Sequence, residues 1–354
     1  METLDLSAPE LFTQATQHGT PIIHGNDVLF VFHGQAQEVF IAGDHTDWEP
    51  ADRMRRFPDQ DLWYLRKRFP SESRIDYKLV VNGKWINDPF NKTLTPSGFG
   101  SNSTLVMPGY QNKFPEIGDT IPRGRVLWDL HYYSHYLEKH MRYHLYLPNN
   151  LGSAHHPPVH AIYAMDGKEY LDYGIIHQVA DYMIARNEMS EAIIVLIDPA
   201  DRTLEYTLYE PYRNYVIQEL LPFIESTYLS KEDPSAIQRT AIGVSWGALT
   251  AIFLAISTPG MFNRILSQSG SFWPKNWLIF DLIEREPRQD IRFCLQSGTI
   301  GDTEKMNDEM VQLLKWKGYP LEYQKFPEGH SWGNWKGHLY EGLRSLFTQG
   351  KWLH

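Results

Sequence analysis

From residue 126 onward, short hydrophobic segments alternate with segments of helical length, and this alternation limits the fold more than any other feature. Helices between consecutive strands make those strands parallel, and parallel strands that are buried on both faces are hydrophobic throughout. We therefore predict an α/β fold with a mostly parallel, doubly wound sheet. The strand-like segments are MRYHLYLP (141–148), VHAIYAMDG (159–167), AIIVLIDP (192–199), RTAIGVSW (239–246), NRILSQSG (263–270), IRFCLQSG (291–298) and LEYQKFPEG (321–329).

The first third of the chain has a different pattern. Between residues 26 and 107, short alternating segments are separated by Gly, Asn, Asp and Pro, and no helical period is present. This pattern is typical of an antiparallel β-sandwich. Residues 108–125 have no period and many Gly and Pro, which indicates a linker. We predict an N-terminal sandwich domain at 1–107, a linker at 108–125 and an α/β domain at 126–354.

Composition excludes several classes of protein. The net charge of −10 argues against nucleic-acid binding, which needs clustered Lys and Arg. No apolar stretch is long enough to span a membrane, and the first residues lack the pattern of a leader peptide, so we expect a cytoplasmic protein. The single cysteine, Cys294, cannot form an internal disulfide and is consistent with that compartment. Aromatic residues make up 14% of the chain, a content that suits ligands with flat faces.

The motif GVSWG at 243–247 follows a predicted strand and precedes the predicted helix ALTAIFLAIS. A strand, a sharp turn and a helix around G-x-S-x-G form the nucleophile elbow of serine hydrolases. Gly243 and Gly247 leave room for the strained serine between them. Ser245 is therefore the candidate nucleophile. The alternative is a tight turn whose serine only caps the helix.

A serine needs a base, and the base needs an acid that orients it. His330 lies just past the last predicted strand, at the edge of the sheet where catalytic groups gather, whereas His338 is expected to be a solvated helix residue. Between Ser245 and His330, the loop after residue 298 offers Asp302, which is closer to the strand end, and Glu304 as the alternative acid. Helix capping is the alternative role for both acids.

Acyl transfer also requires N–H donors for the oxyanion. The backbone amide of Trp246 is one candidate, because it follows the nucleophile. The second donor is expected from the loop after AIYAMDG, either the amide of Asp166 or that of Gly167.

Residues 122–354 resemble the esterase family that includes the enterochelin (ferric enterobactin) esterases and related carbohydrate esterases. The matching pieces are HLYLP, AIYAMDG, the D198...R202..E205 spacing in IDPADRTLEY, QELLPFIE, GVSWG, ILSQSGSFW and EGHSWGNW. The resemblance implies an α/β-hydrolase fold with Ser245 as nucleophile, His330 as base and Asp302 as the acid. It also implies that Arg202, Glu205 and Trp273 lie near the substrate, with Arg202 holding an anionic or metal-bound catecholate. The alternative for Arg202 is an ion pair with Glu205 that holds a loop.

The segments VFIAGDHTDW and IDYKLVVNGKWINDPFN resemble early-set modules of the glycogen-binding type. In such modules two tryptophans, a lysine and an asparagine bind sugar, and the matching residues here are Trp48, Lys78, Trp85 and Asn102. Related sandwiches also precede siderophore esterases, where they shape the entrance of the active site and need bind no glycan. In that case the four residues would be scaffold or cleft wall.

Four histidines, His131, His135, His140 and His144, invite a metal site, but their segment alternates like a hairpin and only Glu138 lies among them. We predict no metal and no cofactor. No pair of carboxylates is placed for glycoside hydrolysis. The sequence thus predicts a serine esterase for a small-molecule ester, most specifically a trilactone or catecholate siderophore that can carry iron. The alternatives are an esterase for feruloyl or acetyl groups on carbohydrate and a non-catalytic glycan-binding protein.

Overall fold

The computed structural model describes residues 7–98, 100–149, 151, 160–229 and 236–348. These residues form two compact units. The sandwich unit contains residues 1–112, 298–302 and 326–334, and the α/β unit contains residues 113–297, 303–325 and 335–354. The first segment of the sandwich unit ends close to the predicted boundary at 107. The sequence does not predict the other two segments of that unit, which come from the last third of the chain.

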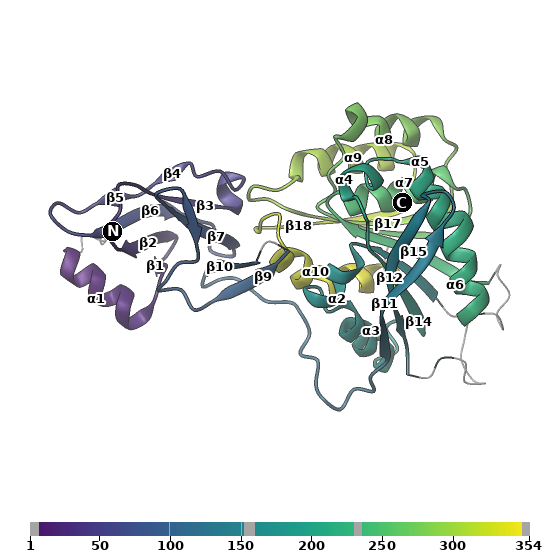
Figure 1. Cartoon of the computed structure of the whole chain (residues 1–354), viewed down its shortest axis with the longest axis horizontal. Helices are drawn as coiled ribbons and strands as arrows, with labels where there is room; N and C mark the ends of the chain where they lie inside the picture. The colour runs from purple at the N-terminus through teal and green to yellow at the C-terminus, as the bar shows by residue number, and fades with distance from the viewer. Residues whose placement is uncertain (1–6, 99, 150, 152–159, 230–235, 349–354) are drawn as a thin grey trace. The chain divides into compact units, whose positions relative to one another are not determined.

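The sandwich unit has two antiparallel sheets, as the turn-rich pattern predicts. Side chains from both sheets form one core that includes Phe30, Ile41, Trp63 and Tyr77. One sheet has the order β1 (Ile22–His24), β2 (Asp27–His33), β6 (Leu62–Arg68), β5 (Arg55–Arg56). The other, shown with it in Figure 1, has the order β4 (Asp52–Arg53), β3 (Val39–Gly43), β7 (Arg74–Val81), β10 (Gly100–Val106), β9 (Leu94–Ser97), and β8 (Lys84–Ile86) pairs with β7.

A helix that the sequence analysis misses, α1 (Ala8–His18), precedes the sandwich. Its local signal is a capping box, in which the Ser7 amide donates to Glu10 Oε2 at 2.8 Å. Leu11 and Ala15, four residues apart, lie on one side of the helix and pack against Leu29 and other apolar residues of the sheet. This contact covers the face of β2 that points away from the main core.

No helix or strand occurs from residue 107 to residue 124, where a linker was predicted. The α/β unit begins with β11 (Arg125–Ser134), which pairs with β12 (Lys139–Leu147) as the predicted hairpin. Its sheet has the order β11, β12, β14 (Ala192–Ile197), β13 (His160–Met165), β15 (Gln238–Val244), β16 (Arg264–Gln268), β17 (Arg292–Gly298), β18 (Leu321–Phe326). β11 and β12 are antiparallel to their neighbours, and the strands from β14 through β17 are parallel. The predicted mostly parallel sheet is confirmed.

Helices cover both faces of this sheet. On one face, apolar side chains of η2, α6, α7, α8 and α9 share a core with alternate residues of the strands, such as Tyr163, Val195 and Leu295. On the other face, Tyr170 of α2 and Trp335 of α10 hydrogen-bond Gln268 of β16. The helices are α2 (Gly167–Asp172), α3 (Ile176–Ala185), α4 (Arg202–Glu205), α5 (Glu210–Asn214), η2 (Tyr215–Leu220), α6 (Leu221–Tyr228), α7 (Trp246–Ser257), α8 (Pro274–Arg285), α9 (Glu304–Trp316) and α10 (Trp332–Phe347).

Among the described residues, no helix has both the length and the apolar character needed to cross a membrane.

Candidate active site

Ser245 lies between the end of β15 and the start of α7, in the turn that the G-x-S-x-G motif predicts. Its backbone has φ 55° and ψ −120°, a region that residues with a side chain rarely adopt. The surrounding backbone holds this conformation. The Ser245 amide donates to Gln268 O at 2.9 Å, and the Ser271 amide donates to Ser245 O at 3.2 Å. The side chain is half-buried, and its Oγ lies 3.1 Å from Ser271 Oγ.

The two glycines of the motif are required by close contacts. A β-carbon on Gly243 would overlap the backbone of Gly247 and Ala248. A β-carbon on Gly247 would lie 2.9 Å from Asp166 Oδ2 and 3.1 Å from Met165 Cβ. The elbow therefore packs directly against the loop that follows β13. This is the loop from which the second oxyanion donor was expected.

In that loop, neighbouring amides already have partners. The Asp166 amide donates to Tyr206 Oη at 2.8 Å, and the Lys168 amide donates to Asp198 Oδ1 at 2.7 Å. The amide of Gly167 lies between them and is the remaining candidate of the two that the sequence left open. Trp246 is the first residue of α7, where backbone N–H groups have no partner within the helix and favour negative charge.

Arg202 and Asp166 form a bidentate ion pair beside the elbow. Arg202 Nε and Nη2 each donate to an oxygen of Asp166 at 2.9 Å. Burial raises the pKa of the Asp166 carboxyl, and the hydrogen bonds and charge of Arg202 oppose that shift. The guanidinium also lies 5.7 Å from the ring centre of Trp246, within the range of a cation–π contact. Arg202 therefore pairs with Asp166, not with Glu205 as the alternative interpretation had it.

The other two residues implied near the substrate differ from each other. Trp273 is 43% exposed, and its ring is 6.0 Å from that of Trp246 in an edge-on arrangement. Glu205 is 1% exposed and accepts from Lys139 Nζ at 2.5 Å and from the Ala200 amide at 2.8 Å. Trp273 thus extends the aromatic surface at Ser245, whereas Glu205 is part of the scaffold.

Two residues that support the loop after β13 were not assigned a role from the sequence. Asp198, the first residue after β14, accepts from the Lys168 amide and from Arg142 Nε, both at 2.7 Å, and lies 3.1 Å from His144 Nε2. Burial raises the pKa of Asp198, but the hydrogen bonds outweigh burial and the net shift is downward. Tyr206 holds the Asp166 amide through its hydroxyl. The sequence pointed to Asp198 by its position at a strand end and by the D198...R202..E205 spacing, without giving it a role.

His330 and Asp302 form a close pair within the sandwich unit. His330 Nδ1 lies 2.7 Å from Asp302 Oδ1, and Asp302 Oδ2 accepts from the Gly298 amide at 2.6 Å. The Asp302 side chain is fully buried, while that of His330 is 29% exposed. Glu304, the alternative acid, is the first residue of α9 and pairs with Lys325 at 2.9 Å. The structure thus joins His330 to Asp302 and places Glu304 in a surface ion pair.

The other histidines named above do not share a metal site: among the residues that the structure describes, no three His, Cys, Asp or Glu side chains are grouped so that they could hold a metal ion. His338, in α10, was expected to be solvated, and this expectation is wrong because only 3% of the residue is exposed. Helix α10 packs on the sheet at this point, where Gln296 Nε2 donates to the His338 carbonyl at 2.9 Å. His131, His135 and His140 are exposed along the hairpin. His144 is buried, where its Nδ1 accepts from the Asp129 amide at 3.0 Å.

The four candidate sugar-binding residues lie in the sandwich unit. Lys78, Trp85 and Asn102 lie on one face of a sheet. Asp76, Lys78 and Val80 alternate onto the same face of β7, Trp85 is paired with Val80, and Asn102 is on the same face of β10 as Thr104, which is paired with Asp76. Trp85 is 43% exposed, whereas Asn102 is 6% exposed. Trp48 is half-buried, and its indole N–H donates to Asp44 Oδ1 at 3.2 Å.

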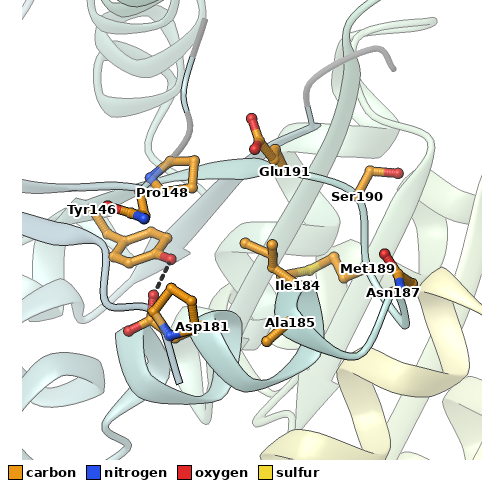
Figure 2. A pocket seen from close by; sticks show the side chains of 11 residues that line it. Tyr146, Pro148, Asp181, Ile184, Ala185, Asn187, Met189, Ser190 and Glu191 are labelled. Atoms are coloured by element: carbon orange, nitrogen blue, oxygen red, sulfur yellow. Dashed lines mark hydrogen bonds between the residues drawn. The ribbon is translucent and has the colours of Figure 1, made fainter. Parts of the chain in front are cut away.

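A cavity of about 390 Å³ lies elsewhere in the α/β unit. Figure 2 shows Tyr146 donating to Asp181 at its edge, over a distance of 2.7 Å. The lining residue Glu191 precedes β14, and Pro148 follows β12, so the cavity is at the amino ends of the parallel strands. Ser245 follows the carboxyl end of β15, at the opposite edge of the sheet. The cavity is therefore separate from the elbow.

The family model described as "Putative esterase" matches residues 134–346. The chain belongs to this esterase family. It is 25% identical over 358 residues to the Iron(III) enterobactin esterase of Escherichia coli K12, covering 87% of this chain and 86% of that protein. The enterobactin esterase FES from Shigella flexneri, crystallised in the presence of enterobactin, superposes with a TM-score of 0.72 at 21% identity and covers 90% of this chain and 92% of that one.

A ferulic acid esterase superposes with a TM-score of 0.53 at 18% identity, covering 64% of this chain and 98% of that one. At these identities the structural matches show the fold alone. The esterase thus has an α/β-hydrolase domain preceded by an antiparallel β-domain, as the resemblance implied.

Proposed function

We propose that the esterase hydrolyses carboxylic esters with Ser245 as nucleophile, His330 as general base and Asp302 as the acid that orients it. The left-handed backbone of Ser245 on its elbow carries this proposal, because such strain persists mainly where function requires it. The short contact between His330 and Asp302 adds support. So does chain topology: Ser245 and Asp302 follow β15 and β17, two strands of the same parallel run, whose carboxyl ends share one edge.

In the proposed reaction, Ser245 Oγ attacks the ester carbonyl carbon while His330 Nε2 takes the serine proton. The oxyanion accepts hydrogen bonds from the amides of Trp246 and Gly167. His330 then gives the proton to the departing alcohol, which leaves an acyl group on the serine. Water, deprotonated by His330, attacks the acyl carbon and releases the acid. Asp302 at Nδ1 fixes the tautomer that keeps Nε2 free to act as the base.

For the substrate, we propose an ester with aromatic groups, most specifically a catecholate trilactone such as a ferric siderophore. Trp246 and Trp273 offer flat apolar faces at the nucleophile, and the Arg202 guanidinium, which is paired with Asp166, lies over Trp246. The Escherichia coli relative is named for iron(III) enterobactin. Iron would arrive with the substrate, and cleavage in the cytoplasm would free it there.

A second candidate is an esterase that removes acyl groups from carbohydrate. The exposed Trp85 favours it, because an indole face can stack on the apolar face of a sugar. Lys78 shares its side of the sheet. In this case the sandwich unit would hold the glycan and the aromatic surface at Ser245 would take a feruloyl group.

The test is hydrolysis of ferric catecholate trilactone, of a feruloyl sugar ester and of p-nitrophenyl butyrate by wild type, Ser245→Ala and His330→Ala. We expect cleavage of the trilactone and a loss of about 1,000-fold or more in both variants. Faster hydrolysis of the feruloyl sugar ester than of the trilactone would favour the second candidate, the esterase that acts on carbohydrate. Absence of hydrolysis on all three esters, with binding to a glycogen gel, would support a non-catalytic glycan-binding protein instead.

A further inference from the structure

The two segments that carry Asp302 and His330 are built into the sandwich unit. They pair with each other, since the Ile300 amide donates to Glu328 O at 3.1 Å. The 326–334 segment also pairs with β7, where Arg74 forms a parallel bridge with Glu328 and the Arg74 amide donates to Pro327 O at 3.2 Å. The side chain of Ile300 packs against the core of the sandwich. Strand β7 therefore supports the 326–334 segment directly, and the 298–302 segment is held by Glu328 and by the contact of Ile300 with the core.

Asp44 lies against the residue that precedes each member of the pair. A β-carbon on Gly329, just before His330, would overlap the carboxyl of Asp44. A β-carbon on Gly301, just before Asp302, would overlap the carbonyl oxygen of Asp44, and Gly301 has φ +56°. Only glycine fits at both positions. A single residue of the sandwich thus sets how far both segments can move toward it.

Asp44 is itself held firmly. It is fully buried, its Oδ2 accepts from the Asp76 amide at 2.7 Å, and its Oδ1 accepts from the indole of Trp48. The chain beyond His330 contacts the same cluster, at Gly333. Arg74, 8% exposed, donates to Asp76 Oδ1 at 3.0 Å, and its guanidinium fills the space that a β-carbon on Gly333 would need.

We propose that Asp44, supported by Arg74 and Asp76, is a positioning residue that fixes the His330 and Asp302 pair from the sandwich unit. This inference rests on the proposed function, since it concerns the base and acid of that reaction. The reason is geometric: a displacement of about 1 Å in a catalytic group can cost roughly 100-fold in rate. Asp44 touches neither substrate nor reacting atoms, so its loss should lower kcat and leave KM nearly unchanged.

The kinetic test compares Asp44→Ala with Asp88→Ala. Asp88 is a matched control: it is 2% exposed in the same unit and accepts from Thr20 Oγ1 and Tyr77 Oη, both at 2.7 Å. We expect Asp44→Ala to lower kcat for p-nitrophenyl butyrate by about 10- to 100-fold with KM within about threefold. Asp88→Ala should lose thermal stability and keep kcat. Equal kcat in the two variants would overturn the proposal.

Asp44→Asn provides the conservative rescue. Asparagine keeps the shape of the side chain against Gly329 and one acceptor oxygen, and it gives up one of the two hydrogen bonds that Asp44 accepts. We expect this variant to keep kcat within about fivefold of wild type while Asp44→Ala does not. If the two substitutions reduce kcat alike, the shape-dependent contact with Gly329 does not position the pair, and the proposal fails.

A readout independent of hydrolysis is the NMR signal of the His330 Nδ1 proton, identified by its loss in His330→Ala. We expect a low-field resonance in wild type, Ser245→Ala and Asp88→Ala, and its loss or broadening in Asp44→Ala. A resonance unchanged in Asp44→Ala would contradict the positioning role. If wild type hydrolyses no ester and the resonance still depends on Asp44, the proposed function fails and the positioning of the pair stands.

Discussion

At the scale of single residues, the ion pair between Arg202 and Asp166 connects the elbow to the loop after β13. Asp166 is 5% exposed and precedes Gly167, and its carboxyl is also the group that a β-carbon on Gly247 would approach. A buried carboxylate needs its partner, because an unpaired buried charge is costly. Arg202 therefore keeps the loop and the elbow in one arrangement, in addition to any contact with substrate.

We expect Arg202→Ala to reduce kcat/KM for p-nitrophenyl butyrate by about 10- to 100-fold and to cost about 1–3 kcal/mol of stability. Arg202→Lys should recover part of both, since it restores the charge without the bidentate geometry. Arg186→Ala is the control, because Arg186 pairs with Glu188 on the surface with 56% of its side chain exposed. Steady-state kinetics and urea unfolding give the comparison. If Arg202→Ala leaves the rate on this uncharged ester unchanged and weakens only the binding of catecholates, Arg202 contacts the substrate and does not hold the loop.

The sequence predicts part of the site at this scale. It selects Ser245, because the motif and its neighbours are contiguous in the chain. It leaves Asp302 and Glu304 open, since both are in one short loop and only the fold shows which one meets His330. The partner of Arg202 is 36 residues away on another strand end, and nothing local in the sequence indicates that pairing.

At the scale of elements, the elbow depends on how closely β15 and α7 approach. We expect Gly243→Ala to destabilise the protein by about 3 kcal/mol or more and to abolish hydrolysis, because the new methyl group would overlap the backbone of the turn. Gly118→Ala is the control: Thr120 Oγ1, at 4.0 Å, is the nearest group to the added carbon. Thermal unfolding and esterase activity test the pair. A Gly243→Ala protein with wild-type stability would mean that the elbow is less tight than described.

The helical segment predicted at 212–229 is observed as α5, η2 and α6, with a π-helical part at Tyr215–Leu220. Pro222 in the first turn of α6 has no amide to donate, and this disrupts the regular bonding of the preceding turn. Periodicity predicts that such a segment is helical because its apolar face is continuous. It does not predict the change in hydrogen bonding, which depends on a single proline.

At the scale of the whole molecule, the sequence predicts two domains because the patterns before and after the linker differ so clearly. It does not predict that 298–302 and 326–334 fold with the sandwich. Those segments read as ordinary loops after strands, and their attachment depends on buried groups such as Asp44 and Arg74 that are more than 200 residues away in the chain. Local patterns carry no information about contacts of that range.

Acid should destabilise the fold through the buried His160. Burial, and secondarily Arg264, lower the pKa of His160 from 6.5 to about 4. In the unfolded chain this histidine takes up a proton near pH 6.5, whereas in the folded protein it stays neutral until about pH 4. The free energy of unfolding is therefore highest above pH 6.5 and falls as the pH drops toward 4. The expected loss from His160 alone is about 2 kcal/mol between pH 7 and pH 5.

Calorimetric unfolding from pH 7.5 to 5 checks this expectation in wild type, His160→Phe and His140→Gln. Phenylalanine keeps the ring contact with Phe347, at 5.0 Å between centres, and cannot take up the proton. Its unfolding temperature should depend less on pH than that of wild type. His140 is exposed, so its variant should follow wild type. Parallel curves for all three proteins would show that His160 does not govern acid stability.

The central claim is that Ser245 is a nucleophile activated by His330 and oriented through Asp302. The most direct measurement is covalent labelling by a fluorophosphonate, with the modified residue located by mass spectrometry. We expect one adduct on Ser245 in wild type and in Glu304→Gln, none in Ser245→Ala, and a rate lower by about 1,000-fold or more in His330→Ala and Asp302→Asn. Labelling that persists in Ser245→Ala, or that is as fast in His330→Ala as in wild type, would contradict the account.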